Sequence, residues 1–322
     1  MNKMKYTLPL LLWAALFTAC TQDEADIPQS HSLLELTASM AEPNTRATSD
    51  GTWKGGEKVA VLATNHNGGG ATYTYTASTT GELTPEDITK AHYWATGEVS
   101  KSVWALYYGD ETADNVAWNG GSSFSGTWSV QGDQTGDGYQ KSDMLWVTQS
   151  IVNANNKANL TFRHQVAKVV IHIIDNDFTK AERNKFEGMS IINYPLTGRW
   201  EVVNMSYPSF ECSWVWHENE NSIKPHELGP QQIKRNGEEI TTFASYEALV
   251  IPDWAIFDTK VFEFDFEGYA PFYYTHSNDL TSWGYGDVYT YCIEINSTGA
   301  VTVGSVTQGN WGYGGSYDLS TQ

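Results

Sequence analysis

The chain has 322 residues and carries 38 acidic against 19 basic side chains, which gives a formal net charge of −19 at pH 7 with neutral histidines. Such an acidic surface argues against nucleic acid or an anionic membrane surface as a partner, because both would repel it. The length is sufficient for two ordinary domains or for one large β domain.

The N-terminus has the pattern of an export signal. Lys3 and Lys5 precede the apolar run Leu8–Phe17, which is followed by Thr, Ala and then Cys20. The run is shorter than the roughly 20 residues that a membrane span needs. We therefore predict a signal peptide over residues 1–19. The cleavage region resembles the lipobox of bacterial lipoproteins, which implies lipidation of Cys20 and an outer-membrane lipid anchor; ordinary secretion with a coincidental Cys is the alternative.

Residues 20–46 form a polar segment with one strand-like stretch. Four apolar residues alternate with polar ones there, which is the period-2 pattern of a half-buried strand. They are Leu34, Leu36, Ala38 and Met40. A turn- and linker-like segment follows and contains one isolated arginine, Arg46, directly before Ala47. A protease would find exposed backbone there.

From Trp53 onward the sequence is almost entirely strand-like. Runs rich in β-branched and aromatic residues alternate with Asn- and Gly-rich turn clusters. The expected strands are Lys58–Thr64, Ala71–Ala77, Ser102–Tyr108, Met144–Thr148, Ala158–His164, Val166–Ile174, Met189–Asn193, Arg199–Asn204, Ala248–Ile251, Val261–Phe266, Val288–Ile295 and Ala300–Val303. The one helix expected is Lys180–Phe186, capped by Thr179. We predict an all-β protein of two β-sandwich domains, residues 47–176 and 177–322.

Sequence motifs give no support for catalysis. The chain lacks the common hydrolase, metalloprotease and phosphate-loop signatures, so we expect no enzyme, no cofactor and no metal. A faint calcium-loop pattern at Asp133 lacks its bidentate Glu, because Met144 stands at that position. Cys212 and Cys292 are either paired or two buried free thiols. The abundant aromatic residues are compatible with a thick core or with sugar binding.

Nine strings occur in a familiar order along the chain. They are Arg46–Thr48, Trp53–Val61, Val103–Tyr108, Asp133–Gln134, Lys141–Trp146, Leu160–Val169, Leu196–Trp200, Ala248–Pro252 and Gly309–Gly315. This order resembles the fimbrillin-like proteins of Bacteroidota, which are type V pilins and their accessory subunits. The resemblance covers essentially the whole chain, and the Phe162-x-His164-x-x-Ala-Lys and Ser-Asp143-x-Leu blocks carry most of it.

The resemblance implies two transthyretin-like β-sandwich domains in tandem and export as a lipoprotein to the cell surface. It also implies that an Arg-specific protease cuts after an arginine in the N-terminal segment, here between Arg46 and Ala47. The cut would remove the strand around residues 33–40 and open a groove for a strand from another fimbrial subunit. The residue pattern agrees with this, because loss of that strand would leave unpaired backbone groups and an apolar slot.

The C-terminal residues continue a period-2 pattern. One face holds Trp311, Tyr313, Gly315, Tyr317 and Leu319, and the other face is small or polar. Glycines weaken a strand that stands alone. We therefore predict a donor strand with Trp311, Tyr313, Tyr317 and Leu319 as its inserted side chains; the alternative is the last edge strand of its own domain.

The predicted function is a structural subunit of a surface fimbria that supports adhesion. A monomeric surface lipoprotein that binds glycans or host ligands is the alternative. The mature N-terminus separates the two, since a chain that begins at Ala47 favours polymerisation and one that retains Cys20 favours a fixed anchor or a monomer.

Overall fold

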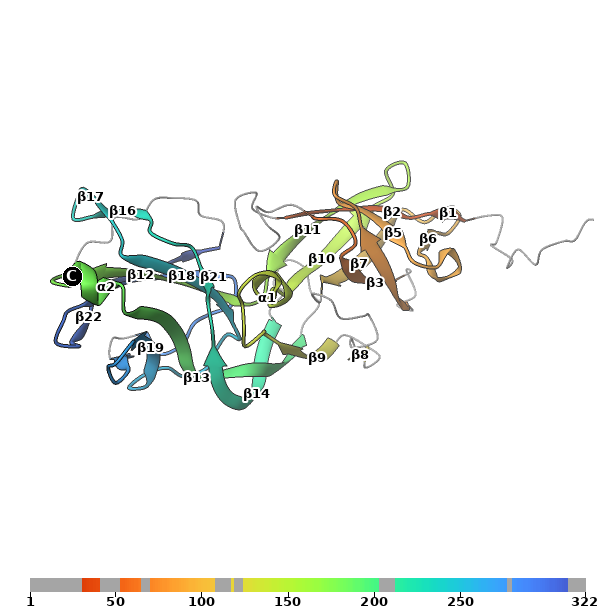
Figure 1. Ribbon diagram of the computed structural model, residues 1–322. Helices are drawn as coiled ribbons and strands as arrows, with labels where there is room; N and C mark the ends of the chain where they lie inside the picture. Colours follow the sequence, from red (N-terminus) through yellow and green to blue (C-terminus); the bar gives the residue numbers. More distant parts are fainter. Residues whose placement is uncertain are drawn as a thin grey trace, which may run out of the picture.

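The computed structural model describes residues 31–40, 53–64, 70–107, 117–118, 124–202, 212–276 and 280–311. These residues form an all-β fold, as predicted (Figure 1). The described helices are short: a 3-10 turn at Ile88–Lys90, α1 at Asp137–Lys141 and α2 at Lys180–Arg183. None of the described helices is long and apolar enough to cross a membrane.

Seven strands of the N-terminal part pair into a closed barrel in the order β10-β11-β2-β5-β4-β3-β7. Their bounds are β2 (Glu35–Met40), β3 (Lys58–Thr64), β4 (Thr72–Ala77), β5 (Glu82–Pro85), β7 (Ser100–Tyr107), β10 (Leu145–Val152) and β11 (Lys157–His164). β1 (Ser32–Leu33) pairs separately with β6 (Tyr93–Trp94). The sequence predicted a sandwich here, and the structure adds that the strand pairing closes on itself.

The barrel interior is filled by the inward members of alternating strands, which form one buried cluster. It includes Val59, Val61, Tyr75, Val103, Tyr107, Leu160 and Phe162. The outward faces of β3, β7 and β10 are also apolar and join the core of the C-terminal part. The barrel is therefore packed inside and also against the rest of the chain.

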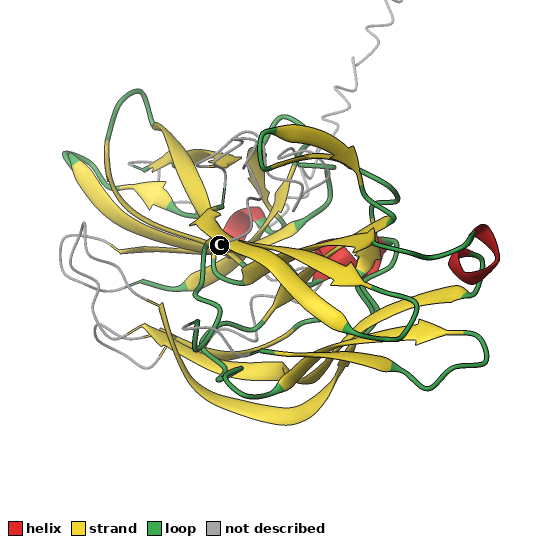
Figure 2. Ribbon diagram, turned by 90° about the vertical axis from the view of Figure 1, so that its left-hand side faces the viewer, coloured by secondary structure: helices red, strands yellow, loops and turns green. Residues whose placement is uncertain are grey.

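The C-terminal part consists of two larger sheets, seen as two layers in Figure 2. The five-stranded sheet has the order β15 (His226–Glu227), β18 (Ala244–Val250), β12 (Ala167–Asp175), β21 (Asp287–Ile295) and β22 (Val301–Asn310). The six-stranded sheet contains β20 (Phe272–Thr275), β19 (Lys260–Phe266), β13 (Phe186–Val202), β9 (Phe124–Ser129), β8 (Ala117–Trp118) and β14 (Cys212–Ile223). The hairpin of β16 (Gln232–Arg235) and β17 (Glu238–Thr241) stands apart.

The change from barrel to C-terminal sheets does not coincide with the predicted boundary between residues 176 and 177. β12 pairs with β18 and β21, so it belongs to the C-terminal part although it precedes that boundary. β8 and β9 likewise join the six-stranded sheet. Only Gln165 and Val166 separate β11 from β12, so no turn signal in the sequence marks the passage from one sheet to the next.

The structure confirms the predicted start of the helix after Thr179 and changes its end and the strands that follow it. The helix ends at Arg183 rather than Phe186, because Phe186 begins β13 and its ring packs on Phe266 with centroids 5.0 Å apart. Its start is as predicted, with Thr179 and Glu182 forming a capping box. The two strands expected between Met189 and Asn204 are one long strand with bulges.

The state of Cys292 and the surroundings of Asp133 bear on the predictions about cysteines and metal binding. Cys292 is a buried free thiol, and burial raises its pKa, which makes it less reactive. Asp133 accepts hydrogen bonds from Thr135 in a local turn. Within the part of the chain that the structure describes, no group of three or more His, Cys, Asp or Glu residues is placed to hold a metal.

Candidate strand-exchange site

The strand β2 closes the barrel by bridging two neighbours. It runs parallel to β11 over six residue pairs, from Glu35 opposite Lys157 to Met40 opposite Phe162. On its other edge it pairs antiparallel with β5 through Leu36 and Thr37 only. Removal of β2 would therefore open the ring of strands between β11 and β5. We call the slot that β2 occupies between these two strands the groove.

The apolar side chains of this strand point into the barrel, as the alternation predicted. Leu34 and Leu36 are each 1% exposed, Ala38 is 5% exposed, and Met40 is partly buried at the end of the strand. Full burial of a large aliphatic side chain contributes about 1.5–3 kcal/mol. The two leucines therefore contribute several kcal/mol to the closed state.

Backbone groups of the segment are held on both edges. On the β11 side the Glu35 N–H donates to the Asn156 carbonyl at 2.8 Å, and the following bonds lie on the opposite edge. The Leu34 N–H donates to the His92 carbonyl at 2.9 Å, and the Ala38 N–H donates to the Gly81 carbonyl at 2.7 Å. The strand also accepts a hydrogen bond, because the indole Nε1 of Trp53 donates to the Ala38 carbonyl at 3.1 Å. Loss of β2 would exchange each of these hydrogen bonds for one to water, at a net cost of about 0.5–1.5 kcal/mol each.

Gly81 lies against β2 without room for a side chain. Its φ is +81°, and a Cβ built there would lie 2.2 Å from the Ala38 carbonyl oxygen. No side chain fits in that space, so the position requires glycine on both conformational and steric grounds. The sequence analysis missed Gly81, since its role depends on a strand that is distant along the chain.

Trp53 forms the floor of the groove beside Ala38. Its ring meets Tyr107 and Phe162 edge to face, with centroid distances of 5.8 and 5.6 Å. Trp53 follows the predicted cleavage point, so it would remain in a processed chain. The groove would then keep an aromatic floor and a free indole donor for an incoming strand.

The outer face of β2 carries polar contacts to β11. Glu35 and Lys157 form an ion pair at 3.2 Å, and Thr37 donates to the Asn159 side chain at 3.1 Å. Both charged side chains are more than half exposed, so the pair adds little stability. It does favour one register of β2 along β11.

The remaining predicted residues divide into two groups. Cys20, Arg46, Ala47, Tyr313, Tyr317 and Leu319 lie outside the described residues. Trp311 is described and is 4% exposed, with its backbone N–H donating to the Gly286 carbonyl at 2.8 Å. Its ring packs in the core of its own chain in this structure, and its assignment as an inserted donor side chain stays a prediction; a donor segment that leaves this packing intact would begin after it.

Trp311 closes a junction between the barrel and the C-terminal sheets. Its ring stacks on His164 at 3.9 Å between centroids with planes 8° apart. His164 also contacts the buried Asp143, Nδ1 to Oδ1, at 2.9 Å. Lys168 lies 5.9 Å from the Trp311 ring centroid and pairs with Glu247 at 2.6 Å. Residues from three of the strings that carry the family resemblance, Lys141–Trp146, Leu160–Val169 and Gly309–Gly315, are thus in contact.

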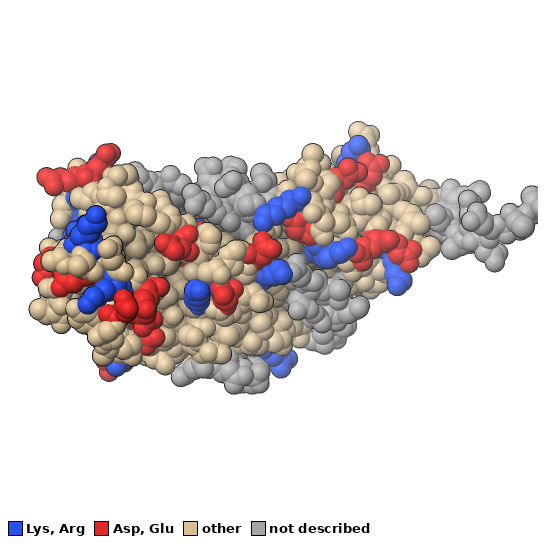
Figure 3. Space-filling view, viewed as in Figure 1, with Lys and Arg blue, Asp and Glu red and all other residues tan. Residues whose placement is uncertain are grey.

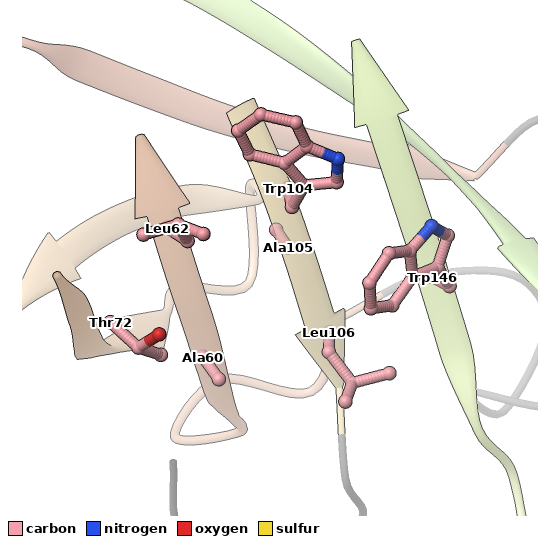
Figure 4. A pocket seen from close by; sticks show the side chains of 7 residues that line it. All are labelled: Ala60, Leu62, Thr72, Trp104, Ala105, Leu106 and Trp146. Atoms are coloured by element: carbon pink, nitrogen blue, oxygen red, sulfur yellow. The ribbon is translucent and has the colours of Figure 1, made fainter. Parts of the chain in front are cut away.

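Two small cavities offer no catalytic arrangement. One lies on the outer face of the barrel sheet, has room for no more than about one water molecule, and is lined by Ala60, Leu62, Thr72, Trp104, Ala105, Leu106 and Trp146 (Figure 4). The other is as small and is lined mainly by Phe178, Phe266, Tyr269 and Phe272. Its one carboxylate, Glu182, already caps α2.

On the face drawn in Figure 3, acidic and basic side chains are interspersed.

Comparisons with known proteins give one family match and several structural ones. The model of a family described as fimbrillin-like matches residues 45–311. Among solved structures, a protein from Bacteroides uniformis provisionally named a cell adhesion protein aligns with a TM-score of 0.59 and 19% identity, covering 88% of this chain and 99% of its own. A similarly named protein from Bacteroides ovatus aligns with a TM-score of 0.57 and 14% identity, covering 88% and 99%. A search of curated proteins gives no match.

Proposed function

The chain belongs to the fimbrillin-like family, and we propose that it is a structural subunit of a surface fimbria that supports cell adhesion and assembles by strand exchange. Membership of the family supports a fimbrial or adhesive role at the cell surface. The observation that carries the finer proposal is β2, which among the described strands is the one between β11 and β5 and which precedes the predicted cleavage point.

Strand exchange follows from the energetics of an emptied groove. Without β2, apolar positions and backbone donors and acceptors of β11 and β5 would face water. A strand from another subunit restores both sets of interactions at once, which is the physical basis of strand addition. The tail with Tyr313, Tyr317 and Leu319 supplies alternating apolar side chains for this purpose.

Proteolysis between Arg46 and Ala47 would free the groove. Arg46→Ala should leave residues 33–40 attached and reduce polymer to background, because β2 then stays covalently linked beside its site. Lys54→Ala is the matched control, since it removes a nearby exposed cation that an Arg-specific protease does not recognise. Polymer yield from surface-sheared material is the readout, and undiminished polymer from Arg46→Ala would contradict the proposal.

The export route completes the proposal. Lipidation of Cys20 would anchor the precursor in the outer membrane until processing releases it, and several acyl chains on one Cys give stable anchoring. Cys20→Ala should leave the precursor unprocessed or in the periplasm, as measured by labelling with palmitate and by surface accessibility to added protease. Normal surface display of this variant would contradict the lipid anchor but not the groove.

A further inference from the structure

The last described residue of the chain, Trp311, lies at the end of β11. Its ring stacks on His164, and His164 is the last residue of β11. β22 runs antiparallel to β21, and β21 runs parallel to β12, the strand that follows β11. The chain turns at Trp311, so residues 312–322 begin within reach of the groove that β2 occupies beside β11.

The contact between Trp311 and His164 gives a point from which a register can be counted. If the tail continues from it as a strand antiparallel to β11, each residue forward on the tail faces one residue back on β11. Tyr313 then faces Phe162, Gly315 faces Leu160, and Asp318 faces Lys157. These β11 residues are the partners of Met40, Ala38 and Glu35 in the structure.

In that register the smallest tail residue meets the smallest position, while Tyr317 needs more room than Leu36 and the emptied groove must widen there. The inward positions of Met40, Ala38, Leu36 and Leu34 would be taken in that order by Tyr313, Gly315, Tyr317 and Leu319. The smallest tail residue thus falls at the smallest position, over the Trp53 indole that bonds to Ala38. A parallel strand over the same seven positions would place Tyr317 at the Ala38 position and Gly315 at that of Leu36, giving a clash and a cavity.

The charge pattern agrees independently. The register puts the Asp318 carboxylate opposite Lys157, where Glu35 forms its ion pair at 3.2 Å. In the parallel arrangement Asp318 would face Thr161 instead. Size and charge together therefore select the antiparallel direction.

From this we infer that, once β2 has been removed, the chain's own segment 313–319 fills its groove antiparallel to β11, with Gly315 at the position of Ala38 and Asp318 beside Lys157. The inference rests on the proposed function, since it assumes that the groove is emptied. The result is a self-closed monomer. Polymerisation would then require the tail to leave its own groove, so self-closure would slow uncontrolled assembly.

The test uses cysteine pairs in the full chain with a site for a sequence-specific protease in place of residues 42–47. The chain is cut, the N-terminal fragment is separated in mild urea, and the remainder is oxidised with diamide. Facing residues on paired strands have Cβ atoms about 4.5–5.5 Å apart, which small backbone adjustments bring within disulfide reach. Asp318→Cys with Lys157→Cys reports the antiparallel register, and Asp318→Cys with Thr161→Cys reports the parallel one.

We expect a disulfide within one chain for the Lys157 pair, at least tenfold more abundant than for the Thr161 pair, and almost none in the uncut chain. Adding Gly315→Val should abolish it, whereas Gly314→Val, on the outward face, should not. The inference is overturned by a disulfide only between chains, by the Thr161 pair dominating, or by no disulfide in either pair. Polymer formation by the cut chain without the new cysteines tests strand exchange separately.

Discussion

Gly81→Ala tests the fit between β2 and its groove most sharply. The added methyl would lie 2.2 Å from the Ala38 carbonyl oxygen, in a residue whose φ is +81°. Gly97 provides a matched control, because its φ is +79° and a Cβ there meets nothing within 4 Å. Both substitutions impose the same backbone strain, and only Gly81→Ala adds a collision with β2.

The expected magnitudes separate the two effects. Placing Ala at a left-handed φ costs about 1–2 kcal/mol in either variant. In Gly81→Ala the strand must also move away, which weakens the 2.7 Å hydrogen bond from Ala38 to Gly81. That bond contributes about 0.5–1.5 kcal/mol, and partial exposure of Leu36 adds a fraction of the 1.5–3 kcal/mol of its burial. We expect Gly81→Ala to be about 1–3 kcal/mol less stable than Gly97→Ala.

The assay combines equilibrium urea unfolding of both variants with hydrogen exchange of the Ala38 amide. We expect faster exchange at Ala38 in Gly81→Ala and wild-type protection in Gly97→Ala, because the Ala38 amide donates across the groove. Equal losses of stability in the two variants, with unchanged protection of Ala38, would refute the reasoning that β2 is held against the Gly81 wall.

Three further predictions concern burial and protonation. Leu36→Ala should lower the free energy of unfolding by about 2–5 kcal/mol, against at most about 0.5 kcal/mol for Val99→Ala, whose side chain is 72% exposed. Trp311→Ala should cost about 3–5 kcal/mol in the same urea assay, because its ring stacks on His164; a loss below 1 kcal/mol would count against the junction. Burial lowers the pKa of His92 to about 4, so the unfolded chain takes up the proton first and stability should fall between pH 6.5 and 4, by up to about 1.4 kcal/mol per pH unit. His92→Gln should reduce that slope in urea titrations at each pH without abolishing it, because burial also lowers the pKa of His172 to about 4.

The period-2 alternation of Leu34, Leu36, Ala38 and Met40 was enough to predict a half-buried strand, since the pleat alone sets which side chains share a face. The same rule could not show that β2 runs parallel to β11 and meets β5 over only two residues, because strand partners depend on the whole fold. The role of Gly81 was beyond sequence reasoning for the same reason.

The C-terminal segment shows a second limit of reasoning from sequence alone. Alternation continues without a break from Trp311 to Leu319, so the sequence alone makes the whole segment look like one donor strand. The stacking of Trp311 on His164 is a tertiary contact, and it assigns the first residue of that pattern to the chain's own core. The junction residues Asp143 and His164 lie in the strings that carried the family resemblance, but nothing in their spacing showed that they touch.

The central claim is that the groove of β2 is emptied and refilled by another subunit. Mass spectrometry of polymer sheared from the cell surface, after chemical cross-linking, tests it most directly. The account predicts chains that begin at Ala47, no peptide covering residues 33–40, and cross-links between chains that join residues 313–319 to β11 or β5. Polymer in which every chain keeps residues 33–40 would contradict the account.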